Sequence, residues 1–496
     1  MKAYQDASLA PARRAKALLE EMTLAEKVGQ LNQRLYGFRI YERKCVNGED
    51  SIELSEEFRQ EVEKYSGLGV LYGLYRADPW ADKDYETGLT GVLSKKAYNQ
   101  VQRYVLEHSR LGIPVMMSSE CPHGHQALDG YLLPVNLLAG ATFDPAMVRA
   151  AYRVSGRQLQ NMGVDFALMS MLDVLRDPRW GRSEECYSED PYLSARMAEA
   201  AVIGMQESGP EVVAKHFAAQ GEGTGGVNAS AARIGERELR EIHFPPATAA
   251  IKAGAKGIMA AYNEIDGVYC HANRWLLNDV IRKEMGFDGI VMSDGVAIDQ
   301  LDSMTGDNVV SGALALQSGV DVGLWDEAFG KLEEAVRRGL VKEAQIDQAV
   351  LRVLTLKFER GLFEHPYLEE EGEIHVDYAQ NPESVQLARE GLVILQNKNQ
   401  VLPFWENQAS GKKIAVVGPN ADDLYNQLGD YTPPLRRDDG ITVLDGMKLI
   451  FKESDIRFSQ GCYLRKRDEN LLKEAVDTVK NSDIVICVLG GSSSRF

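Results

Sequence analysis

Short apolar runs alternate with longer amphipathic segments from the N-terminus of the chain to about Phe363. Seven runs have the length and composition of buried parallel strands, namely Leu68–Leu74, Ile113–Ser118, Asp165–Ser170, Val212–His216, Gly257–Ala261, Ile290–Ser293 and Val320–Leu324. Between them, segments such as Asp144–Asn161 and Pro191–Glu207 place apolar residues at helical spacing. Strands that alternate with helices in this way predict βαβ units built on a parallel sheet.

The position of an eighth strand is ambiguous. The best candidate lies near Val28–Leu35, although Ala10–Glu21 and Leu24–Gln33 have patterns more typical of helices. After the seventh strand, Asp347–Arg360 has the periodicity of a helix that ends at Gly361. We therefore expect an α/β fold in which residues 1–365 form a (β/α)8 TIM-like barrel.

A second α/β pattern follows an acidic linker, which we place at residues 366–381. The second domain, residues 382–496, is predicted to begin with a helix that runs through Arg389. Its further predicted elements are strands at Leu392–Leu395, Lys413–Gly418, Ile456–Ser459 and Ile484–Leu489, and helices at Leu444–Lys452 and Asn470–Lys480. Because the chain ends at Phe496, just beyond a strand, we expect this domain to be incomplete.

Polar side chains close several of the predicted barrel strands. Glu120 follows the second strand, Lys215 and His216 end the fourth, Tyr262 follows the fifth and Asp294 follows the sixth. The carboxyl ends of the strands form the active face of a (β/α)8 barrel, so these side chains are expected to gather there. Asp294, directly after a buried strand, has the position of a catalytic nucleophile.

Composition limits the class of partner. A formal net charge of −18 and a pI near 5.1 oppose binding to nucleic acid or to an anionic membrane. No apolar stretch has the length of a membrane span or the form of a secretory signal, so the expected location is the cytoplasm. We expect a neutral small molecule as the partner, and homo-oligomer formation stays open.

The cysteines and histidines do not predict a metal site. The six cysteines are widely spaced and form no C-x-x-C pair. His123 and His125 lie near Glu120, but they are two residues apart and no further ligand cluster has the spacing of a metal site. We expect neither a metal ion nor an organic cofactor.

Four ordered motifs carry a family resemblance. The loop Asp177–Tyr192 combines turn residues, arginines, acids and aromatic residues. Together with Lys215–Phe217, Gly257–Asn263 and Gly286–Asp294, it resembles glycoside hydrolase family 3, the group of β-glucosidases, β-xylosidases and related enzymes. The resemblance implies a (β/α)8-like barrel followed by an α/β sandwich domain, and hydrolysis of β-linked sugars with retention.

The loop after Lys215 and His216 resembles the glucosidase and xylosidase branch. Its sequence is Gly221-Glu-Gly-Thr-Gly-Gly-Val-Asn228, whereas the hexosaminidase branch carries an Asp-His dyad in this loop and residues 218–233 contain no His. The expected substrates are therefore β-glucosides or β-xylosides, as small molecules or oligosaccharides.

The resemblance also implies roles for individual residues. Asp294 matches the nucleophile, Tyr262 matches a residue that orients it by hydrogen bonding, and the residues that match substrate-binding positions are Glu120, Arg182, Lys215 and His216. Retaining hydrolysis needs a carboxylate about 5 Å from the general acid, so that the carboxylate can attack the anomeric carbon.

These roles have structural alternatives. Asp294 could cap a helix, His216 could be an ordinary buried histidine, and Tyr262 could serve packing alone. Lys215 could instead form a Schiff base, as a strand-end lysine does in barrel aldolases. In the long loop Arg182 is expected to contact ligand, whereas the other charged residues are expected to serve the structure of the loop: Arg179, Glu184, Glu185 and Asp190.

Gly295 departs from the family pattern. Many members carry an aromatic residue directly after the nucleophile, where it forms a wall of the sugar site. Here the corresponding residue has no side chain, so the site is wider or another ring fills the gap. The candidate rings are those of Trp80, Trp180 and Trp325.

The general acid/base is the second departure. In the glucosidase branch this glutamate usually lies in the second domain, in a loop beyond the strand that Ile484–Leu489 resembles, so we expect it beyond Phe496. Without proton donation to the leaving oxygen, glycosylation should slow by about 10²–10⁴. The alternative to an active hydrolase is therefore a truncated, catalytically impaired homologue that binds glycans.

Overall fold

The computed structural model describes residues 2–372, 377 and 380–492 of the chain. The chain forms two compact units, Met1–Gly391 and Leu392–Phe496. Parts of the predicted linker, residues 373–376 and 378–379, and the end of the predicted second domain, residues 493–496, lie outside the described residues.

A parallel sheet forms the centre of the first unit. Its strands are β3 (Val70–Tyr72), β4 (Met116–Glu120), β5 (Phe166–Ser170), β6 (Glu211–Phe217), β7 (Gly257–Ala260) and β10 (Ile290–Met292), and they pair in that order. Nearly every strand residue is buried, as the apolar runs predicted. Six of the seven predicted strands are thereby confirmed, with their ends shifted by a few residues.

The sheet curls until its two edges meet through extended segments. The seventh predicted strand, Val320–Leu324, makes one parallel bridge, between Val322 and Met292, and is not a full strand. The backbone N–H groups of Gly323 and Trp325 donate to carbonyls at positions 31 and 33, at 3.0 Å each. Residues 31–36 also pair with the other edge through a bridge between Tyr36 and Tyr72. This segment takes the place of the eighth strand, and the predicted helix Leu24–Gln33 ends at Gln30.

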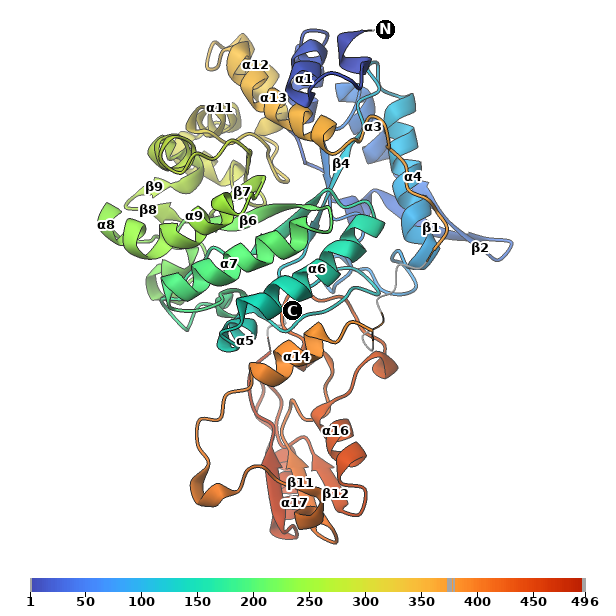
Figure 1. Ribbon diagram of the computed structural model, residues 1–496, viewed down its shortest axis with the longest axis vertical. Coiled ribbons are helices and arrows are strands. Elements are labelled where there is room, and N and C mark those ends of the chain that lie inside the picture. The colour runs from blue at the N-terminus through green and yellow to red at the C-terminus, as the bar shows by residue number, and fades with distance from the viewer. Residues whose placement is uncertain (1, 373–376, 378–379, 493–496) are drawn as a thin grey trace. The chain divides into compact units, whose positions relative to one another are not determined.

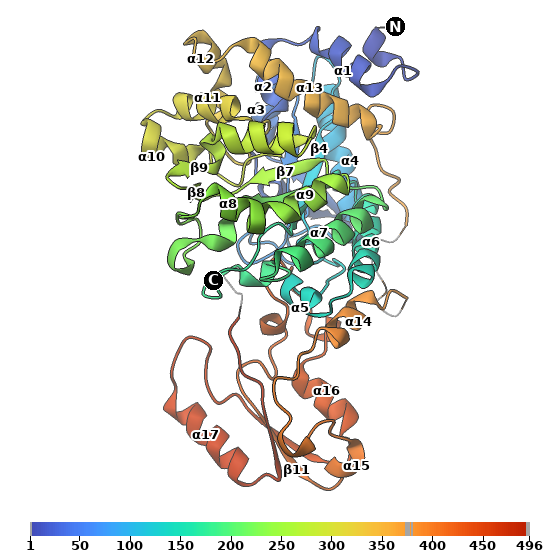
Figure 2. The same ribbon diagram turned by 60° about the vertical axis from the view of Figure 1, so that its left-hand side comes forward.

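Helices cover the outside of the sheet. The principal ones are α1 (Pro11–Leu19), α2 (Leu24–Gln30), α3 (Glu56–Tyr65), α4 (Gly91–Glu107), α5 (Asn136–Ala141), α6 (Pro145–Asn161), α7 (Pro191–Gln206), α9 (Phe244–Lys252), the π-helix η8 (Trp275–Glu284), α11 (Asn308–Ser318), α12 (Leu332–Arg337), α13 (Glu343–Glu359) and α14 (Glu383–Glu390). Figures 1 and 2 show α1 beside α13, so the two ends of the barrel sequence pack together. Helix α14 packs against α5 and α6 and belongs to the first unit, although the sequence assigned it to the second domain.

Helix α13 illustrates how the pattern sets the packing. Its buried residues include Ile346, Ala349, Val350 and Val353, whose i, i+3, i+4, i+7 spacing forms one apolar face. On the same helix the fully buried ammonium of Lys357 donates to Oε1 of Gln30 and to the carbonyls of residues 68 and 114, at 2.7–3.3 Å. These acceptors lie at the amino ends of the first strands, opposite the face that carries the candidate residues.

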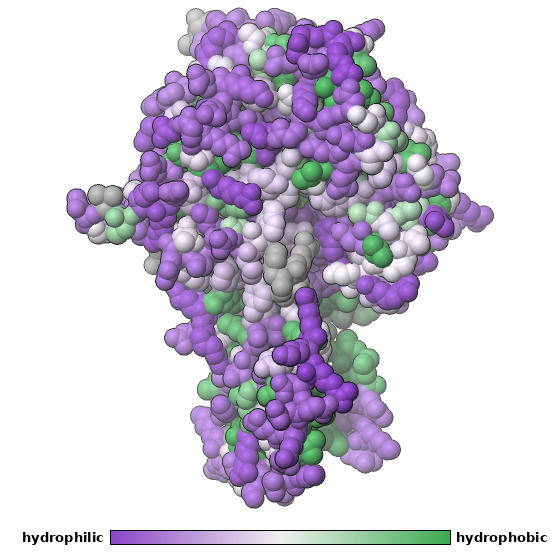
Figure 3. All heavy atoms as spheres, turned by 180° about the vertical axis from the view of Figure 1, so that it is seen from behind, coloured by the Kyte–Doolittle hydropathy of each residue, from purple (hydrophilic) through white to green (hydrophobic). Residues whose placement is uncertain are grey.

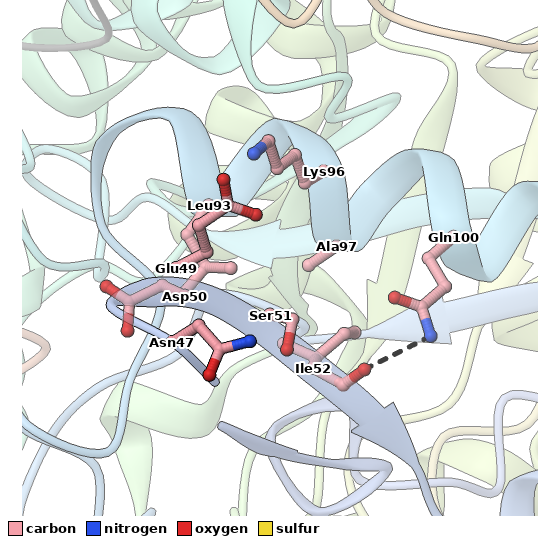
Figure 4. A pocket seen from close by; sticks show the side chains of 9 residues that line it. All are labelled: Asn47, Glu49, Asp50, Ser51, Ile52, Leu93, Lys96, Ala97 and Gln100. Atoms are coloured by element: carbon pink, nitrogen blue, oxygen red, sulfur yellow. Dashed lines mark hydrogen bonds between the residues drawn. The ribbon is translucent and has the colours of Figure 1, made fainter. Parts of the chain in front are cut away.

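A β-hairpin precedes α3 and was not predicted. Its strands β1 (Tyr41–Val46) and β2 (Glu49–Leu54) pair antiparallel, and β2 packs against α4. A pocket of about 510 Å³ lies between the hairpin and α4, lined mainly by polar side chains. Figure 4 shows its lining residues and the hydrogen bond from Nε2 of Gln100 to the carbonyl of Ile52, 3.2 Å long.

The second unit contains a small parallel sheet. Its strands β11 (Lys413–Val417), β12 (Asp455–Ser459) and β13 (Ile484–Cys487) lie in the order β12-β11-β13, and its longer helices are α16 (Val443–Ile450) and α17 (Glu469–Lys480). These elements confirm the predicted α/β pattern. The predicted strand Leu392–Leu395 is wrong, because these residues have no strand pairing and their side chains are exposed.

Hydrophobic residues reach the surface of the second unit. Large exposed apolar side chains include Leu395, Trp405, Ile441, Leu449 and Leu489. Figure 3 shows hydrophobic patches on this unit, whereas the same view of the first unit is mostly hydrophilic. Among the helices of the described residues, none has the length and apolar character that crossing a membrane requires.

Candidate active site

The structure brings the predicted polar residues together at the carboxyl ends of the strands. Glu120 is the last residue of β4, Lys215 and His216 lie in β6, and Asp294 comes two residues after β10. All four side chains are buried, together with Arg182 from the loop after β5. Buried charged groups of this kind are retained where they are paired or serve a ligand.

Both Lys215 and His216 point to this face, although neighbours on a regular strand face opposite ways. The register between β6 and β7 shifts between Ala214 and Phe217, which interrupts the alternation. Nζ of Lys215 lies 2.6 Å from Oε2 of Glu120, and Nε2 of His216 lies 3.6 Å from Oδ2 of Asp294. The irregularity therefore allows two consecutive residues to serve one site.

Glu120 is held between two neighbours. Its Oε2 pairs with Lys215, and its Oε1 accepts a hydrogen bond from the hydroxyl of Tyr72 at 3.1 Å. The Tyr72 hydroxyl also contacts Arg76, which is paired with Asp78. An ammonium that is paired with a buried carboxylate is favoured in its charged form, which does not suit the neutral amine that a Schiff base requires.

His216 is fixed by an acid on one side and a base on the other. Its Nδ1 lies 2.7 Å from Oδ2 of Asp173, and its Nε2 lies 2.9 Å from a terminal nitrogen of Arg182. A guanidinium only donates, so Nε2 is the acceptor and Nδ1 carries the proton. The hydrogen-bond network thus assigns the neutral Nδ1–H tautomer.

Asp173 is itself a titratable group of the site. Burial raises the pKa of its carboxyl to about 7, while the positive charge of Arg182 opposes this rise. The backbone N–H of His216 also donates to Asp173, at 3.3 Å. Asp173 therefore sets both the position and the tautomer of the imidazole.

Asp294 has one oxygen engaged and one available. Oδ1 accepts from the backbone N–H of Gly295 at 2.8 Å, and the backbone N–H of Asp294 donates to Nε2 of His271 at 3.1 Å. Within the described part of the chain, the buried Oδ2 accepts no hydrogen bond. Nε2 of His216 lies 3.6 Å from this oxygen, beyond hydrogen-bond distance.

Burial and neighbouring charges shift the pKa of the Asp294 carboxyl in opposite directions. Burial raises the pKa of its carboxyl, whereas the positive charges of Arg182 and Lys215 lower it. The next helix along the described chain, η9, begins only at Asp299, so Asp294 does not act as a helix cap. A buried carboxylate with an available oxygen and two nearby cations is suited to nucleophilic attack.

The long loop after β5 contains residues that stabilise the loop itself and one residue, Arg182, that reaches the site. Arg182 forms two bonds with Glu185, at 2.6 and 2.9 Å, and Glu185 also accepts from the hydroxyl of Ser170 at 2.6 Å. Asp190 caps α7 through the backbone N–H of Leu193. Glu185 and Asp190 thus serve the structure of the loop, and Glu185 holds Arg182 beside His216.

Tyr262 contacts the backbone directly after Asp294. Its hydroxyl donates to the carbonyl of Gly295 at 2.9 Å. This bond positions the turn that carries Asp294. A Cβ atom added to Gly295 would lie 2.5 Å from the ring of Trp325, so that ring fills the space where a side chain would project.

Three residues of the site were not predicted from the sequence. Asp173 follows β5, and its position near a strand end was the available signal. Tyr72 lies within β3, where an aromatic residue is typical of any strand. His271 follows the short hairpin of β8 (Glu264–Ile265) and β9 (Val268–Tyr269), and no pattern in the sequence distinguishes it.

The other histidines near the site have ordinary partners. Nε2 of His125 lies 2.8 Å from the hydroxyl of Ser119, and burial lowers the pKa of His125 to about 3. Nδ1 of His123 lies 3.2 Å from the carbonyl of Leu133. In the residues that the structure covers, no group of three or more potential ligands could hold a metal ion.

Two family models match the chain. The glycosyl hydrolase family 3 N-terminal domain matches residues 23–356, and the glycosyl hydrolase family 3 C-terminal domain matches residues 392–495. The two matched regions lie within the two compact units of the structure.

Individual proteins are also similar. A β-xylosidase from Formosa agariphila is 32% identical over 84% of this chain and 62% of its own length. The solved structure of a β-glucosidase from Erythrobacter marinus has a TM-score of 0.87 and 31% identity, covering 99% of this chain and 67% of that one. The chain spans less than two thirds of the length of the curated relatives that it matches.

A third similar protein is a β-glucosidase from Listeria innocua solved in complex with glucose. Its TM-score is 0.83 at 28% identity, covering 97% of this chain and 64% of that one. A mutant of the same enzyme is solved in complex with laminaribiose.

Proposed function

Because the chain belongs to glycosyl hydrolase family 3, we propose that it is a retaining glycosidase that releases terminal β-linked glucose or xylose through a covalent bond to Asp294. The observation that carries the proposal is the buried Oδ2 of Asp294, which has no hydrogen-bond donor among the described residues and lies beside His216 and Arg182. An oxygen that is already desolvated and unengaged needs little reorganisation before it attacks.

In the first step Oδ2 of Asp294 bonds to the anomeric carbon while the bond from that carbon to the leaving oxygen breaks. Burial raises the pKa of the Asp294 carboxyl, and the positive charges of Arg182 and Lys215 oppose this rise and favour the ionised form that attacks. Water then hydrolyses the glycosyl ester and restores the carboxylate. The leaving oxygen needs a proton, and a phenol leaving group depends on that proton least.

Hydroxyl recognition is assigned to the charged residues around the nucleophile. Glu120 accepts hydrogen bonds, whereas Lys215 and Arg182 donate them, so together they can pair with neighbouring hydroxyls of one sugar. A site built to pair with hydroxyls discriminates strongly against analogues that lack them. The names of the similar β-xylosidase and β-glucosidases support xylose and glucose as the sugars to test first.

The test is release of nitrophenol from nitrophenyl β-glucoside and β-xyloside by the purified chain, with and without azide. Asp294→Ala should abolish release, and Asp279→Ala is the matched control because Asp279 lies on η8 in an exposed ion pair with Lys283. Azide can attack the glycosyl ester in place of activated water, so release that requires azide still supports the bond to Asp294. No release under either condition from a folded protein would refute the proposal.

A further inference from the structure

Three aromatic rings pack together, and one of them, that of Trp325, lies against Gly295, the residue after Asp294. Trp325 follows the segment Val320–Leu324, Tyr36 ends the segment that closes the barrel, and Trp80 lies in the loop after β3. The ring of Trp325 stacks on Tyr36, with centroids 4.6 Å apart, and lies 5.3 Å from the ring of Trp80. All three side chains are partly exposed, so they are not simply core residues.

A side chain at position 295 and the indole of Trp325 would compete for the same space. A Cβ on Gly295 would lie 2.5 Å from Cε3 of Trp325 and 3.3 Å from the hydroxyl of Tyr262. The first distance is far inside van der Waals contact, so a side chain at position 295 requires the indole to move. The ring beside the nucleophile can come from only one of the two positions, and here it comes from Trp325.

Trp325 also reaches the hydroxyl-binding side of the site. Its ring meets the ring of Tyr72 edge to face, with centroids 4.8 Å apart and an interplanar angle of 84°. The hydroxyl of Tyr72 donates to Glu120. The indole therefore lies between the residue that follows the nucleophile and the tyrosine that supports Glu120, where the ring of a bound sugar would span from Asp294 to Glu120.

The backbone at Trp325 is fixed in an uncommon conformation. Its φ is 63°, in the left-handed region that large L residues rarely adopt, and its N–H donates to the carbonyl of Gln33 at 3.0 Å. Conformations of this kind cost free energy and cluster at ligand sites. The hydrogen bond to the barrel-closing segment thus fixes the backbone of Trp325, and this backbone conformation directs the indole toward the site.

We propose that Trp325 is the specificity-determining wall of the sugar subsite, in the place that a side chain at position 295 would otherwise take. The inference rests on the proposed function and adds the residue against which the ring of the β-glycoside packs. The apolar C–H face of a pyranose ring is suited to contact with an indole, as other apolar groups are.

Binding tests this without requiring turnover. The dissociation constants of isofagomine, methyl β-glucoside and phenyl β-glucoside would be measured by calorimetry for the wild type, Trp325→Ala and Trp325→Phe. Trp325→Ala should weaken all three about threefold to tenfold, whereas Trp325→Phe should change them about threefold or less. Trp405→Ala is the control, because Trp405 is exposed and lies in the second unit.

An exchange of side chains tests the mutual exclusion. Gly295→Trp alone should lose isofagomine binding, because the new ring meets the existing indole. Gly295→Trp combined with Trp325→Gly should recover affinity to within about threefold, since one ring again walls the subsite. Thermal unfolding of each variant identifies loss of fold. If Trp325→Ala does not fold, the loss in Gly295→Trp and its recovery in the double variant still test the role of Trp325.

The outcomes separate this inference from the proposed function. Binding by the wild type that is unchanged in Trp325→Ala overturns the role of Trp325 and leaves the proposed function standing. A loss confined to phenyl β-glucoside overturns it too, because the ring would then contact the leaving group and not the sugar. A wild type that binds none of the three ligands refutes the proposed function and this inference with it.

Discussion

Nε2 of His216 lies 3.6 Å from Oδ2 of Asp294, and both atoms are acceptors in the tautomer that Asp173 and Arg182 impose. No hydrogen bond therefore joins the imidazole to the carboxylate. Because Nε2 already accepts from Arg182, a sugar hydroxyl placed near this pair would donate to Oδ2 of Asp294, which has no hydrogen-bond partner among the described residues.

Removing the acid that sets the tautomer tests it. In Asp173→Asn the amide presents either an oxygen or a donor to Nδ1 of His216, so the imidazole loses its charged partner. We expect the affinity for isofagomine to fall about tenfold, since hydrogen bonds to charged groups contribute about 1.5–3 kcal/mol. Calorimetry measures this, with Asp177→Asn as the control from the same loop, where Asp177 pairs with exposed Arg179. Equal affinities of wild type and Asp173→Asn would contradict the assigned role.

The buried pair of Lys215 and Glu120 should behave as one unit. Lys215→Met or Glu120→Gln alone leaves a buried group without its charged partner, and each should lower the free energy of unfolding by about 3–5 kcal/mol. The double variant should cost clearly less than the sum, because neither charge remains. Urea unfolding in a Trp405→Phe background measures this, since the other four of the five tryptophans lie in the first unit. Additive losses would argue against a coupled pair.

The acid side of the pH profile for covalent labelling of Asp294 should depend on Arg182. Burial raises the pKa of Asp294 and the guanidinium lowers it, so removal of the positive charge should move the pKa further up. Arg182→Gln combined with Glu185→Gln avoids a buried unpaired glutamate. In this variant the rate of covalent labelling should decline at higher pH on the acid side than in the wild type. An unchanged acid limb would mean that Arg182 does not act on Asp294 electrostatically.

Lys357 should make stability depend on pH. Burial lowers its pKa to about 7, whereas an unfolded lysine titrates near about 10.4. Between these values the unfolded state binds a proton that the folded state does not, so stability rises with pH by about 1.4 kcal/mol per unit and is flat below about 7.

The measurement for Lys357 is urea unfolding at several pH values in the Trp405→Phe background. Lys357→Met has no titrating group and should lose this slope, although it leaves the acceptors of Gln30, Leu68 and Pro114 without a donor. The difference between wild type and variant isolates Lys357 from other groups that titrate in the same range. Parallel curves for the two proteins would contradict the shifted pKa.

The barrel strands were predictable because strands buried on both faces must be apolar over their whole length. Residues 31–36 were not, because Asn32, Gln33 and Arg34 interrupt any strand pattern. Their extended form depends on backbone hydrogen bonds to both sheet edges, and no local pattern encodes those partners. The prediction of a strand at Leu392–Leu395 was wrong for the opposite reason. This run has the apolar composition of a strand, but it has no neighbouring strand to pair with and its side chains remain exposed.

The site was predictable where a residue ends a strand and matches a motif. Asp294, Glu120, Lys215 and His216 meet that condition. The choice among the three tryptophans could not be made, because it depends on which ring reaches Gly295 across the barrel. Trp180 proves to be buried and bonded to Asn228, whereas Trp325 lies against Gly295.

Mass spectrometry after incubation with a dinitrophenyl 2-deoxy-2-fluoro-β-glucoside, and with the xyloside, tests the central claim most directly. The fluorine slows hydrolysis of the ester and the phenol leaves without a strong acid, so the covalent intermediate should accumulate. The account predicts one glycosyl group per chain, on the peptide that contains Asp294, and none in Asp294→Asn. A folded wild-type chain that carries no label, or carries it on another residue, would contradict the assignment of Asp294 as the nucleophile.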